Sequence, residues 1–137
     1  MDKIHKVGVI GSRTITNRDD VWIPLTRLLD TTSLQKDKIV VLSGGAKGVD
    51  TLAQQWADVN NVPFILFKPY FLVDSRAPYD PRHYFTRNKQ IIDNSDIIIA
   101  FWDGHTKGAS WGINYARKTK KTLVIVDVPI TSEVADK

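Results

Sequence analysis

The chain carries a glycine-rich turn at Ser43–Asp50 (SGGAKGVD), between the apolar run Ile39–Leu42 and an amphipathic helical pattern. A turn of this kind from a strand into a helix exposes backbone N–H groups at the positive end of the helix dipole. Such groups bind phosphate or another anion. The turn therefore indicates a site for a nucleotide-like ligand.

Two other turns have a similar composition, Gly11-Ser12-Arg13 and Trp102–Gly108. Each turn supplies glycine, a small hydroxyl and a cation. Ligands of open α/β sheets bind beyond the carboxyl ends of the strands, where the strand order reverses. Three such turns at one edge predict an anionic ligand. The sequence lacks the spacing of a Walker A loop and the third glycine of the dinucleotide fingerprint.

Several polar residues in these turns allow two interpretations. Arg13 and Lys47 are either phosphate ligands or solvated loop cations. Asp50 falls in the first turn of a helix, where a carboxylate is favoured by the helix dipole, and it could also bind a ribose.

Arg87 and Asn88 share the core-facing side of a helix predicted from Asp80 to about Asp93. A cation on such a stripe must be paired or must line a cavity. Two interpretations explain the position of Arg87. It forms an internal ion pair with Asp50 or Asp103, or it contacts a ligand. Both place Arg87 at the edge of the site.

The remaining candidates are histidines and aromatic residues. His5, His83 and His105 lack the spacing of metal ligands, so we predict neither a metal site nor a cofactor. Trp111 and Tyr115 lie four residues apart, away from the small-residue stripe of their helix. They indicate a subunit interface, base stacking or packing under a neighbouring loop.

Five short β-branched runs alternate with helical patterns. They are nearly continuous in hydrophobicity, which predicts parallel strands buried on both faces. We expect a Rossmann-like three-layer α/β sandwich whose five-stranded, mainly parallel sheet has the order 3-2-1-4-5. The runs are Val7–Ile10, Ile39–Leu42, Pro63–Phe67, Ile97–Phe101 and Thr122–Val126.

Four helices are expected between these runs. Pro24 is compatible with the first helix only near its first turn. Asp80 and Pro81 resemble a helix N-cap followed by proline at the first helical position. A longer loop, rich in proline and aromatic residues, is expected at Lys68–Tyr79, and loops of this length are often lids or binding loops. The apolar stripes are Val21, Leu25, Leu28 and Leu29, then Val49, Leu52, Ala53, Trp56 and Ala57, then Tyr84, Ile91 and Ile92, and then Ala109, Gly112, Ile113 and Ala116.

Composition limits the function classes. The 137 residues suit one domain over 1–137, with a core at about 6–127 and a polar tail at 128–137. The absence of cysteine excludes disulfides, thiolate metal sites and cysteine nucleophiles. The net charge of +4 suits an anionic ligand, and nucleic acid is possible, although the basic run Arg117–Lys121 is typical of a helix C-terminus. The sequence contains neither a membrane-spanning stretch nor a signal peptide, so we expect a cytoplasmic protein.

The chain resembles the SLOG superfamily, which includes DNA-processing proteins of the DprA (SMF) type and LOG phosphoribohydrolases. It is most similar to the small YspA/YpsA-like branch. The resemblance implies a Rossmann-like fold, a nucleotide or nucleotide-derived ligand and a homodimer or higher homo-oligomer. The matching residues are Gly11-Ser12-Arg13, Ser43–Asp50, Ala53, Ala57, Arg87-Asn88, Ala100–Gly104, Thr106, Lys107, Gly108 and Ala116.

The fourth strand–helix turn departs from the LOG pattern, which ends Pro-Gly-Gly-x-Gly-Thr-x-x-Glu. Here Gly104–Gly112 contains no glutamate. Cleavage of an N-glycosidic bond usually needs a carboxylate, which Asp50 or Asp103 could supply while Arg87 orients the ribose.

Three functions follow in order of preference. The first is a sensor or sequestering module for an ADP-ribose-like or cyclic nucleotide, the second is an N-glycosidic hydrolase, and the third is DprA-like binding of single-stranded DNA. The catalytic candidates are Asp50, Asp103 and Arg87. The predicted ligand-binding residues are Gly11, Ser12, Arg13, Ser43, Gly44, Gly45, Ala46, Lys47, Gly48, Asp50, Arg87, Asn88, Trp102, Asp103, Gly104, Thr106, Lys107 and Gly108.

Overall fold

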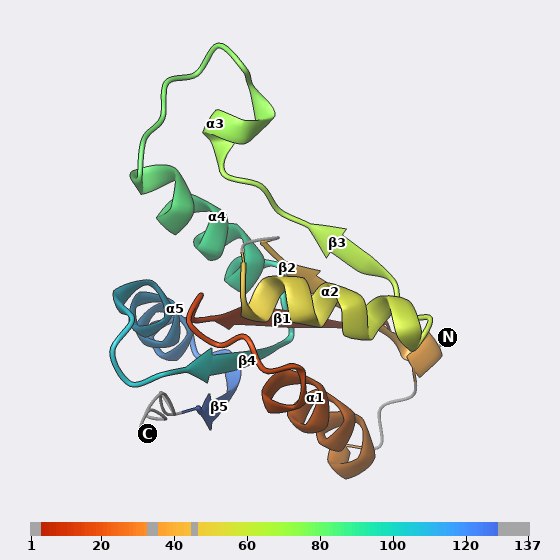
Figure 1. Ribbon diagram of the computed structural model, residues 1–137. Helices are drawn as coiled ribbons and strands as arrows, with labels where there is room; N and C mark the ends of the chain where they lie inside the picture. The colour runs from red at the N-terminus through yellow and green to blue at the C-terminus, as the bar shows by residue number, and fades with distance from the viewer. Residues whose placement is uncertain (1–3, 33–35, 45–46, 129–137) are drawn as a thin grey trace, which may run out of the picture.

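The computed structural model describes residues 4–32, 36–44 and 47–128. Within them, five parallel strands form one sheet in the order β3-β2-β1-β4-β5, which confirms the predicted fold (Figure 1). The strands are β1 (His5–Gly11), β2 (Ile39–Ser43), β3 (Phe64–Leu66), β4 (Ile97–Trp102) and β5 (Thr122–Asp127). The helices are α1 (Arg18–Thr32), a 3-10 turn (Lys36–Lys38), α2 (Val49–Val59), α3 (Tyr70–Val73), α4 (Arg82–Asp93) and α5 (Lys107–Lys118).

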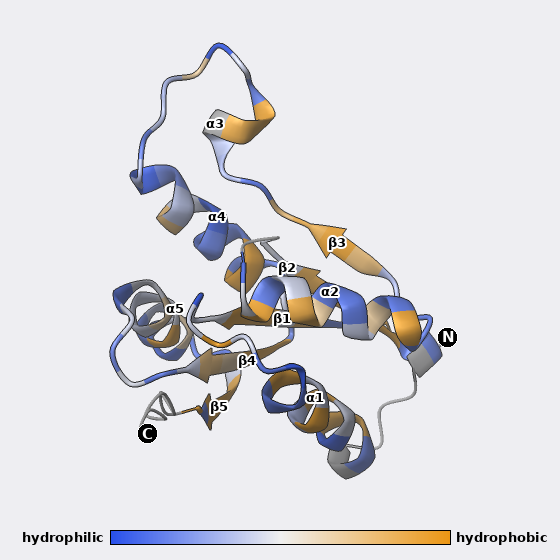
Figure 2. Ribbon diagram, in the orientation of Figure 1, coloured by the Kyte–Doolittle hydropathy of each residue, from blue (hydrophilic) through white to orange (hydrophobic). Residues whose placement is uncertain are grey.

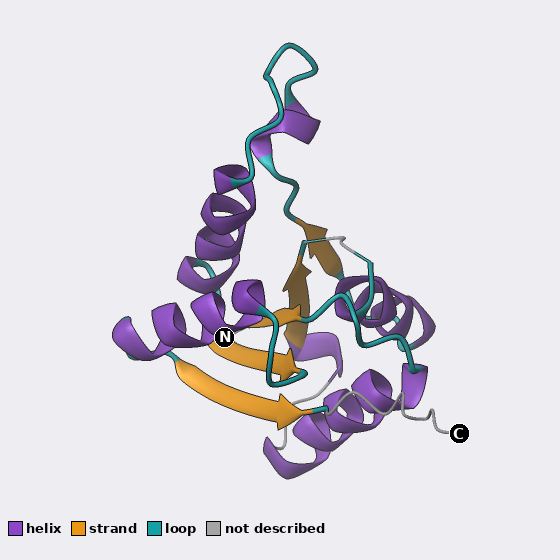
Figure 3. Cartoon of the chain, turned by 60° about the vertical axis from the view of Figure 1, so that its left-hand side comes forward, coloured by secondary structure: helices purple, strands orange, loops and turns teal. Residues whose placement is uncertain are grey.

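Helices cover both faces of the sheet (Figure 3). Successive strand residues point to opposite faces, so Ile99 joins the core under α1 and α2, whereas Ile98 joins the core under α4 and α5. Trp56 of α2 is the largest fully buried side chain on the first face. The predicted apolar stripes of α2 and α5 are the sides of these helices that pack on the sheet.

The two edge strands differ from the prediction of strands buried on both faces. The central strands β1, β2 and β4 are buried over most of their length. In contrast, β3 and β5 are partly exposed, because the helices lie over the middle of the sheet. Figure 2 shows the apolar residues of β3 at this uncovered edge.

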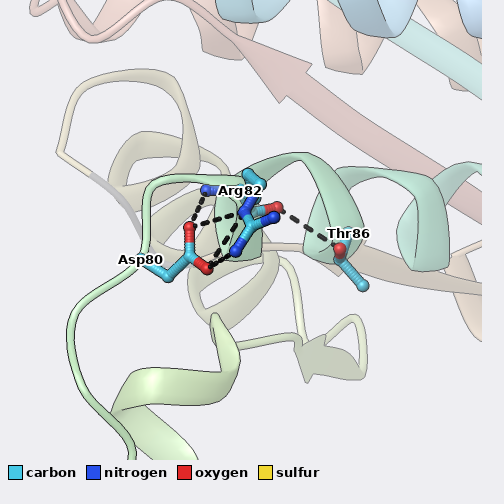
Figure 4. Close-up of polar contacts among 3 residues, drawn as sticks. All are labelled: Asp80, Arg82 and Thr86. Carbon is cyan, nitrogen blue, oxygen red and sulfur yellow. Dashed lines mark hydrogen bonds and ion pairs between the residues drawn. The ribbon is translucent and has the colours of Figure 1, made fainter.

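Helix α4 begins at Arg82, one residue later than the Asp80-Pro81 pair predicts, with Pro81 rather than Asp80 at the N-cap position. The Asp80 carboxylate accepts hydrogen bonds from the backbone N–H of Arg82 at 2.9 Å and from its guanidinium (Figure 4). Pro81 already has helical dihedral angles, and Thr86 Oγ1 donates to the carbonyl of Arg82 one turn later. The helix ends at Asp93, as predicted. This start fixes the direction in which α4 presents Arg87.

Two local expectations were wrong. Pro24 lies in the interior of α1 rather than near its first turn. The helix is maintained there because Val21 and Leu25 on either side of the proline are fully buried, and this packing offsets the missing N–H donor. The segment Lys68–Tyr79, predicted as a longer loop, contains the short helix α3 directly after Pro69. The ring of Tyr70 in this helix lies edge-on to the ring of His83, with the ring centroids 5.6 Å apart.

The C-terminal boundary of the core also extends slightly. Val128, assigned to the tail from sequence, is buried, and its N–H donates to the carbonyl of Trp102 at 2.9 Å. The rest of the predicted tail, 129–137, lies outside the described residues. Within the described ranges, no helix has the length and hydropathy needed to cross a lipid bilayer.

Gly11 sets how closely α2 approaches the end of β1. A Cβ atom at this position would lie 2.6–2.8 Å from the side-chain carbons of Val49, the first residue of α2. We therefore expect Gly11→Ala to lower the free energy of unfolding by about 1–3 kcal/mol, because the helix must shift. Urea unfolding measures this change.

A double-mutant cycle with Val49→Ala provides the control. Removing the two methyl groups that would collide should make the double variant more stable than the sum of the single changes predicts. Strictly additive effects would show that the close approach of these two residues does not limit stability.

Candidate ligand-binding site

The first and third glycine-containing turns are joined directly to each other. The N–H of Ser12 donates to the carbonyl of Phe101 at 3.0 Å, and the N–H of Asp103 donates to Ser12 Oγ at 3.3 Å. Thr14 Oγ1 donates to Asp103 Oδ2 at 2.6 Å. The β1–α1 and β4–α5 connections therefore lie together at the carboxyl edge of the sheet.

The second turn lies against the first. Gly48 has a φ of 79°, and a Cβ at this position would lie 2.8 Å from the carbonyl oxygen of Arg13. Only glycine combines this backbone conformation with so close an approach. Below the turn, the buried Ser43 Oγ lies 2.9 Å from Asp50 Oδ1 and 3.0 Å from the carbonyl oxygen of Val9. All three turns thus meet at one edge.

The carboxylate of Asp103 is fully engaged in shaping its own turn. It accepts four hydrogen bonds, from the hydroxyls of Thr14 and Thr106 and from the backbone N–H groups of His105 and Thr106. Burial by itself would raise the pKa of Asp103, but these donors outweigh it and hold the pKa far below its ordinary value. This carboxylate positions the start of α5 and has little remaining capacity for acid–base chemistry.

Arg87 is buried between α4 and the end of β2. Its Nη1 donates to the carbonyl of Gly44 at 2.8 Å, and its Nε donates to Asn88 Oδ1 at 2.8 Å. A Cβ at Gly44 would overlap the guanidinium, so this glycine makes the contact possible. Burial lowers the pKa of Arg87, attraction to Asp50 raises it, and repulsion from Arg13 lowers it further.

Two cations share one aromatic ring. The guanidinium carbon of Arg13 lies 5.1 Å from the ring centroid of Tyr84, and that of Arg87 lies 5.7 Å from the same centroid. Both distances are in the range of cation–π attraction. Tyr84 therefore holds an exposed arginine from the β1–α1 turn and a buried arginine from α4 next to each other.

These groups surround a cavity of about 340 Å³. Its wall is formed by the end of β1, by the first residues of α2 and α5, and by one side of α4. The predicted site residues that line it are Gly11, Arg13, Asp50, Arg87, Asn88, Thr106 and Gly108.

Other predicted residues lie beside the cavity rather than in its wall. They support the turns, as Ser12 and Asp103 do, or are exposed, as Lys47 and Lys107 are. Gly45 and Ala46 lie outside the described residues. The predicted residues outside the wall are Ser12, Ser43, Gly44, Lys47, Gly48, Trp102, Asp103, Gly104 and Lys107.

Sequence reasoning missed much of the apolar wall. Tyr84 and Ile91 were assigned to a buried stripe, and Phe85 was not considered. Tyr84, Arg87, Asn88 and Ile91 follow the spacing i, i+3, i+4, i+7 of one helix face. A face that combines an aromatic ring, a cation and an amide could have identified a cavity wall from sequence.

The predicted aromatic pair on α5 packs against α4. Trp111 stacks on Tyr115, with ring centroids 5.3 Å apart and an interplanar angle of 3°, and Phe85 lies 5.4 Å from Trp111. The Tyr115 hydroxyl donates to Asp93 at the end of α4. These aromatic residues fasten the two helices that form one side of the cavity.

A family comparison matches the N-terminal part of this arrangement. The model of the YspA, cpYpsA-related SLOG family matches residues 5–71, which contain the first two glycine-containing turns. This segment of the chain therefore matches the SLOG family that the sequence resembles. Arg87 and Asp103 lie C-terminal to the matched segment, and the fold brings both to the edge at which the SLOG turns lie.

Solved structures share the fold of this chain at low identity. DNA processing protein A from Helicobacter pylori has a TM-score of 0.68 and 23% identity over 96% of this chain and 72% of that one. The structural genomics target TM1055 has a TM-score of 0.60 and 19% identity over 88% of this chain and 72% of that one. The molybdenum cofactor carrier protein from Chlamydomonas reinhardtii has a TM-score of 0.56 and 18% identity over 88% and 76%. A comparison with curated protein sequences found no match.

The hydrogen bonds of Asp103 predict a stabilising role. Asp103→Asn keeps the shape of the side chain but removes the charge and half of the acceptor capacity. We expect a loss of about 2 kcal/mol in the free energy of unfolding at neutral pH, measured by urea unfolding.

The stability difference between wild type and Asp103→Asn should decrease as the pH falls. Because the pKa of Asp103 is lowered on folding, its contribution is complete above the ordinary value of 3.8 and declines as the pH falls below it. Wild type and variant should therefore converge in acid. Equal stability of the two proteins at neutral pH would contradict this role.

Proposed function

We propose that this SLOG protein binds a nucleotide or nucleotide-derived ligand, of the ADP-ribose-like or cyclic-nucleotide kind, in the cavity beside Arg13 and Arg87. It would act there as a sensor or a sequestering module in the cytoplasm. The observation that carries this proposal is the pair of guanidinium groups on the ring of Tyr84 at the cavity wall.

The charges of the cavity wall favour an anion. Arg13, Arg87 and Asp50 are the charged side chains in the wall. They leave one net positive charge. Burial lowers the pKa of Arg87, and repulsion from the charge of Arg13 lowers it further. A phosphate between the two guanidinium groups would remove this repulsion and accept planar, charge-assisted hydrogen bonds.

The rest of the wall suits the uncharged part of a nucleotide. Tyr84, Phe85 and Ile91 offer aromatic and aliphatic surface beside the cations. Small-molecule sites combine such surface with a few polar groups in volumes of roughly 300–1,000 Å³, and this cavity has about 340 Å³. The amide of Asn88 and the hydroxyl of Thr106 could orient a base or ribose.

The carboxylates at the site favour binding of a ligand without its hydrolysis. The glutamate of the LOG pattern is absent from the β4–α5 turn, and Asp103 is held by four hydrogen bonds. These features favour a ligand-binding module over a hydrolase.

One observation supports the hydrolase alternative. Asp50 lines the cavity and is buried near Arg87, so a carboxylate is present in the cavity wall. It could stabilise oxocarbenium charge during cleavage of an N-glycosidic bond.

Single-stranded DNA is a third candidate. The DNA processing protein A of Helicobacter pylori, which shares the fold, binds single-stranded DNA. Phe85, Trp111 and Tyr115 form an aromatic strip beside the cavity, but Trp111 and Tyr115 already stack on each other. This leaves fewer free ring faces for bases, and we rank this function below the other two.

Ligand binding can be tested by blocking the cavity. A Cβ at Gly108 meets no atom within 4 Å, so Gly108→Leu should fill the cavity without disturbing the fold, and Gly108→Ala is the matched control. Melting temperatures are measured with nucleoside monophosphates, ADP-ribose, cyclic nucleotides and a single-stranded oligonucleotide. A ligand at one hundred times its Kd should stabilise wild type and the alanine variant by about 2.7 kcal/mol.

The leucine variant should lose this stabilisation while keeping its own melting temperature. Equal stabilisation of the leucine variant by the same ligand would place the ligand elsewhere. Failure of every nucleotide to stabilise the wild type would overturn the proposal, and a response to the oligonucleotide alone would favour DNA.

The hydrolase alternative depends on Asp50. If the protein cleaves nucleotides, wild type should release free base from a nucleoside monophosphate, and Asp50→Asn should reduce the rate at least a hundredfold, the scale of a positioned acid–base group. Chromatography of the products measures both rates. If wild type releases no free base, the hydrolase alternative is excluded and the binding function is not. If the variant turns over at the wild-type rate, Asp50 takes no part in the mechanism.

A further inference from the structure

Asn88 of α4 is held in one orientation by the arginine that precedes it in the chain. The Nε–H of Arg87 donates to Asn88 Oδ1 at 2.8 Å. Arg87 is itself buried, and its Nη1 donates to the carbonyls of Gly44 at 2.8 Å and Phe67 at 3.4 Å. Because these bonds hold the guanidinium on one side and Asn88 accepts on the other, the amide of Asn88 has little freedom to turn.

The direction of this amide follows from the chemistry of arginine. A guanidinium has only N–H donors, so the atom of Asn88 that faces Nε must be its carbonyl oxygen. The N–H2 group then remains for another partner. Among the described residues, Asn88 Nδ2 has no protein acceptor, and Asn88 lines the cavity. The side chain therefore presents hydrogen-bond donors to a bound molecule, while its acceptor is already in use.

The neighbours of Asn88 on the helix form a surface for a base. Tyr84 precedes it by four residues and Ile91 follows it by three, so the three side chains share one face of α4. All three line the cavity. An aromatic ring and an aliphatic side chain offer apolar contact to a flat base, and an amide between them reaches the polar edge of that base.

An asparagine that can only donate reads bases differently from a free one. A free asparagine pairs with adenine through two bonds, since its oxygen accepts from the exocyclic amino group and its nitrogen donates to the neighbouring ring nitrogen. Here Oδ1 already accepts from Arg87, so the amino group of adenine would compete for that oxygen and lie against N–H donors. Guanine and hypoxanthine instead carry an exocyclic oxygen beside the same ring nitrogen, and both atoms accept hydrogen bonds.

The carboxylate of the cavity wall does not reverse this difference. Asp50 accepts a hydrogen bond from Ser43 Oγ at 2.9 Å, and its charge attracts Arg87. Both kinds of purine can offer it an N–H donor, adenine through its amino group and the oxopurines through the ring N–H beside their oxygen. The discrimination between the two kinds therefore depends on Asn88.

We propose that the Arg87–Asn88 pair makes the cavity selective for oxopurine nucleotides, those of guanine and hypoxanthine, over adenine nucleotides. Asn88 contacts the base, and Arg87 is a positioning residue that acts through Asn88. This inference rests on the proposed binding of a nucleotide and narrows it to one class of base.

Replacing the amide by a carboxylate tests the selection. Asn88→Asp keeps an oxygen for Arg87 but changes the group that faces the cavity from a donor to an acceptor. Wild type should bind GMP and IMP at least about tenfold more tightly than AMP, the scale of one base-edge contact. In the variant this ratio should fall at least about tenfold, because a carboxylate accepts from the amino group and repels the oxygen. Calorimetric titration measures the Kd values, and cGMP and cAMP are compared in the same way.

Asn114→Asp is the matched control. Asn114 is an exposed residue of α5 outside the cavity wall, so the same change of charge there should leave the ratio of Kd values as in wild type. The melting temperature of Asn88→Asp should be no lower than that of wild type, because a charge-assisted hydrogen bond replaces a neutral acceptor at Arg87. An unchanged fold with an altered base preference separates a ligand contact from a purely structural role.

Arg87→Lys tests the positioning role. Lysine keeps the positive charge but lacks the Nε–H donor, so the amide of Asn88 is free to turn its oxygen to the base. The preference for GMP over AMP should then decrease toward equal affinity. A preference equal to that of wild type would show that Arg87 does not orient Asn88.

Two further results would overturn the inference. If wild type binds AMP as tightly as GMP, or more tightly, the cavity does not select oxopurines, although nucleotide binding stands. If Asn88→Asp keeps the wild-type ratio, Asn88 does not face the base. If wild type binds none of these purine nucleotides, the inference fails, and the ligand panel used with Gly108→Leu shows whether the proposed function fails with it.

Discussion

The candidate site depends on one buried cation, the guanidinium of Arg87. A buried charge is costly unless it is paired or hydrogen-bonded, and here the carbonyl of Gly44 and the amide of Asn88 supply acceptors. This contact joins α4 to the end of β2, across elements far apart in the chain. It requires a residue without a side chain at position 44, and the glycine-rich turn provides it. The position of the cavity wall follows from this contact.

Asp103 plays the corresponding role on the other side of the site. The hydrogen bond from Thr14 holds the β4–α5 turn against the β1–α1 turn, and the three from His105 and Thr106 shape the β4–α5 turn itself. All four stabilise the charged carboxylate. A carboxylate held in this way is suited to positioning, whereas general acid–base catalysis needs a pKa near the working pH. Asp50 differs because it lines the cavity. The two aspartates that seemed equivalent in the sequence therefore differ in what chemistry they can perform.

The family match and the structural comparisons separate the residues that build the shared fold from those that line the cavity. The SLOG family match contains the first two turns, and the shared fold extends to proteins below 25% identity, among them a DNA-binding protein and a cofactor carrier. A parallel sheet with its turns at one edge accepts different ligands by changing the residues around that edge. In this chain, Arg13, Tyr84 and Arg87 bring two cations and an aromatic ring together at that edge.

The sequence by itself determined the sheet order, the helix faces and the three turns, because β-branched runs and helical periodicity are local signals of burial. It also indicated Arg87, since a cation on a core-facing stripe needs a partner. The tertiary structure alone decided that Asp103 is held by Thr14, that Arg13 and Arg87 both lie over the ring of Tyr84, and that β3 forms an exposed edge. These features depend on which side chains meet across elements distant in the chain, and helical or strand periodicity carries no information about such contacts.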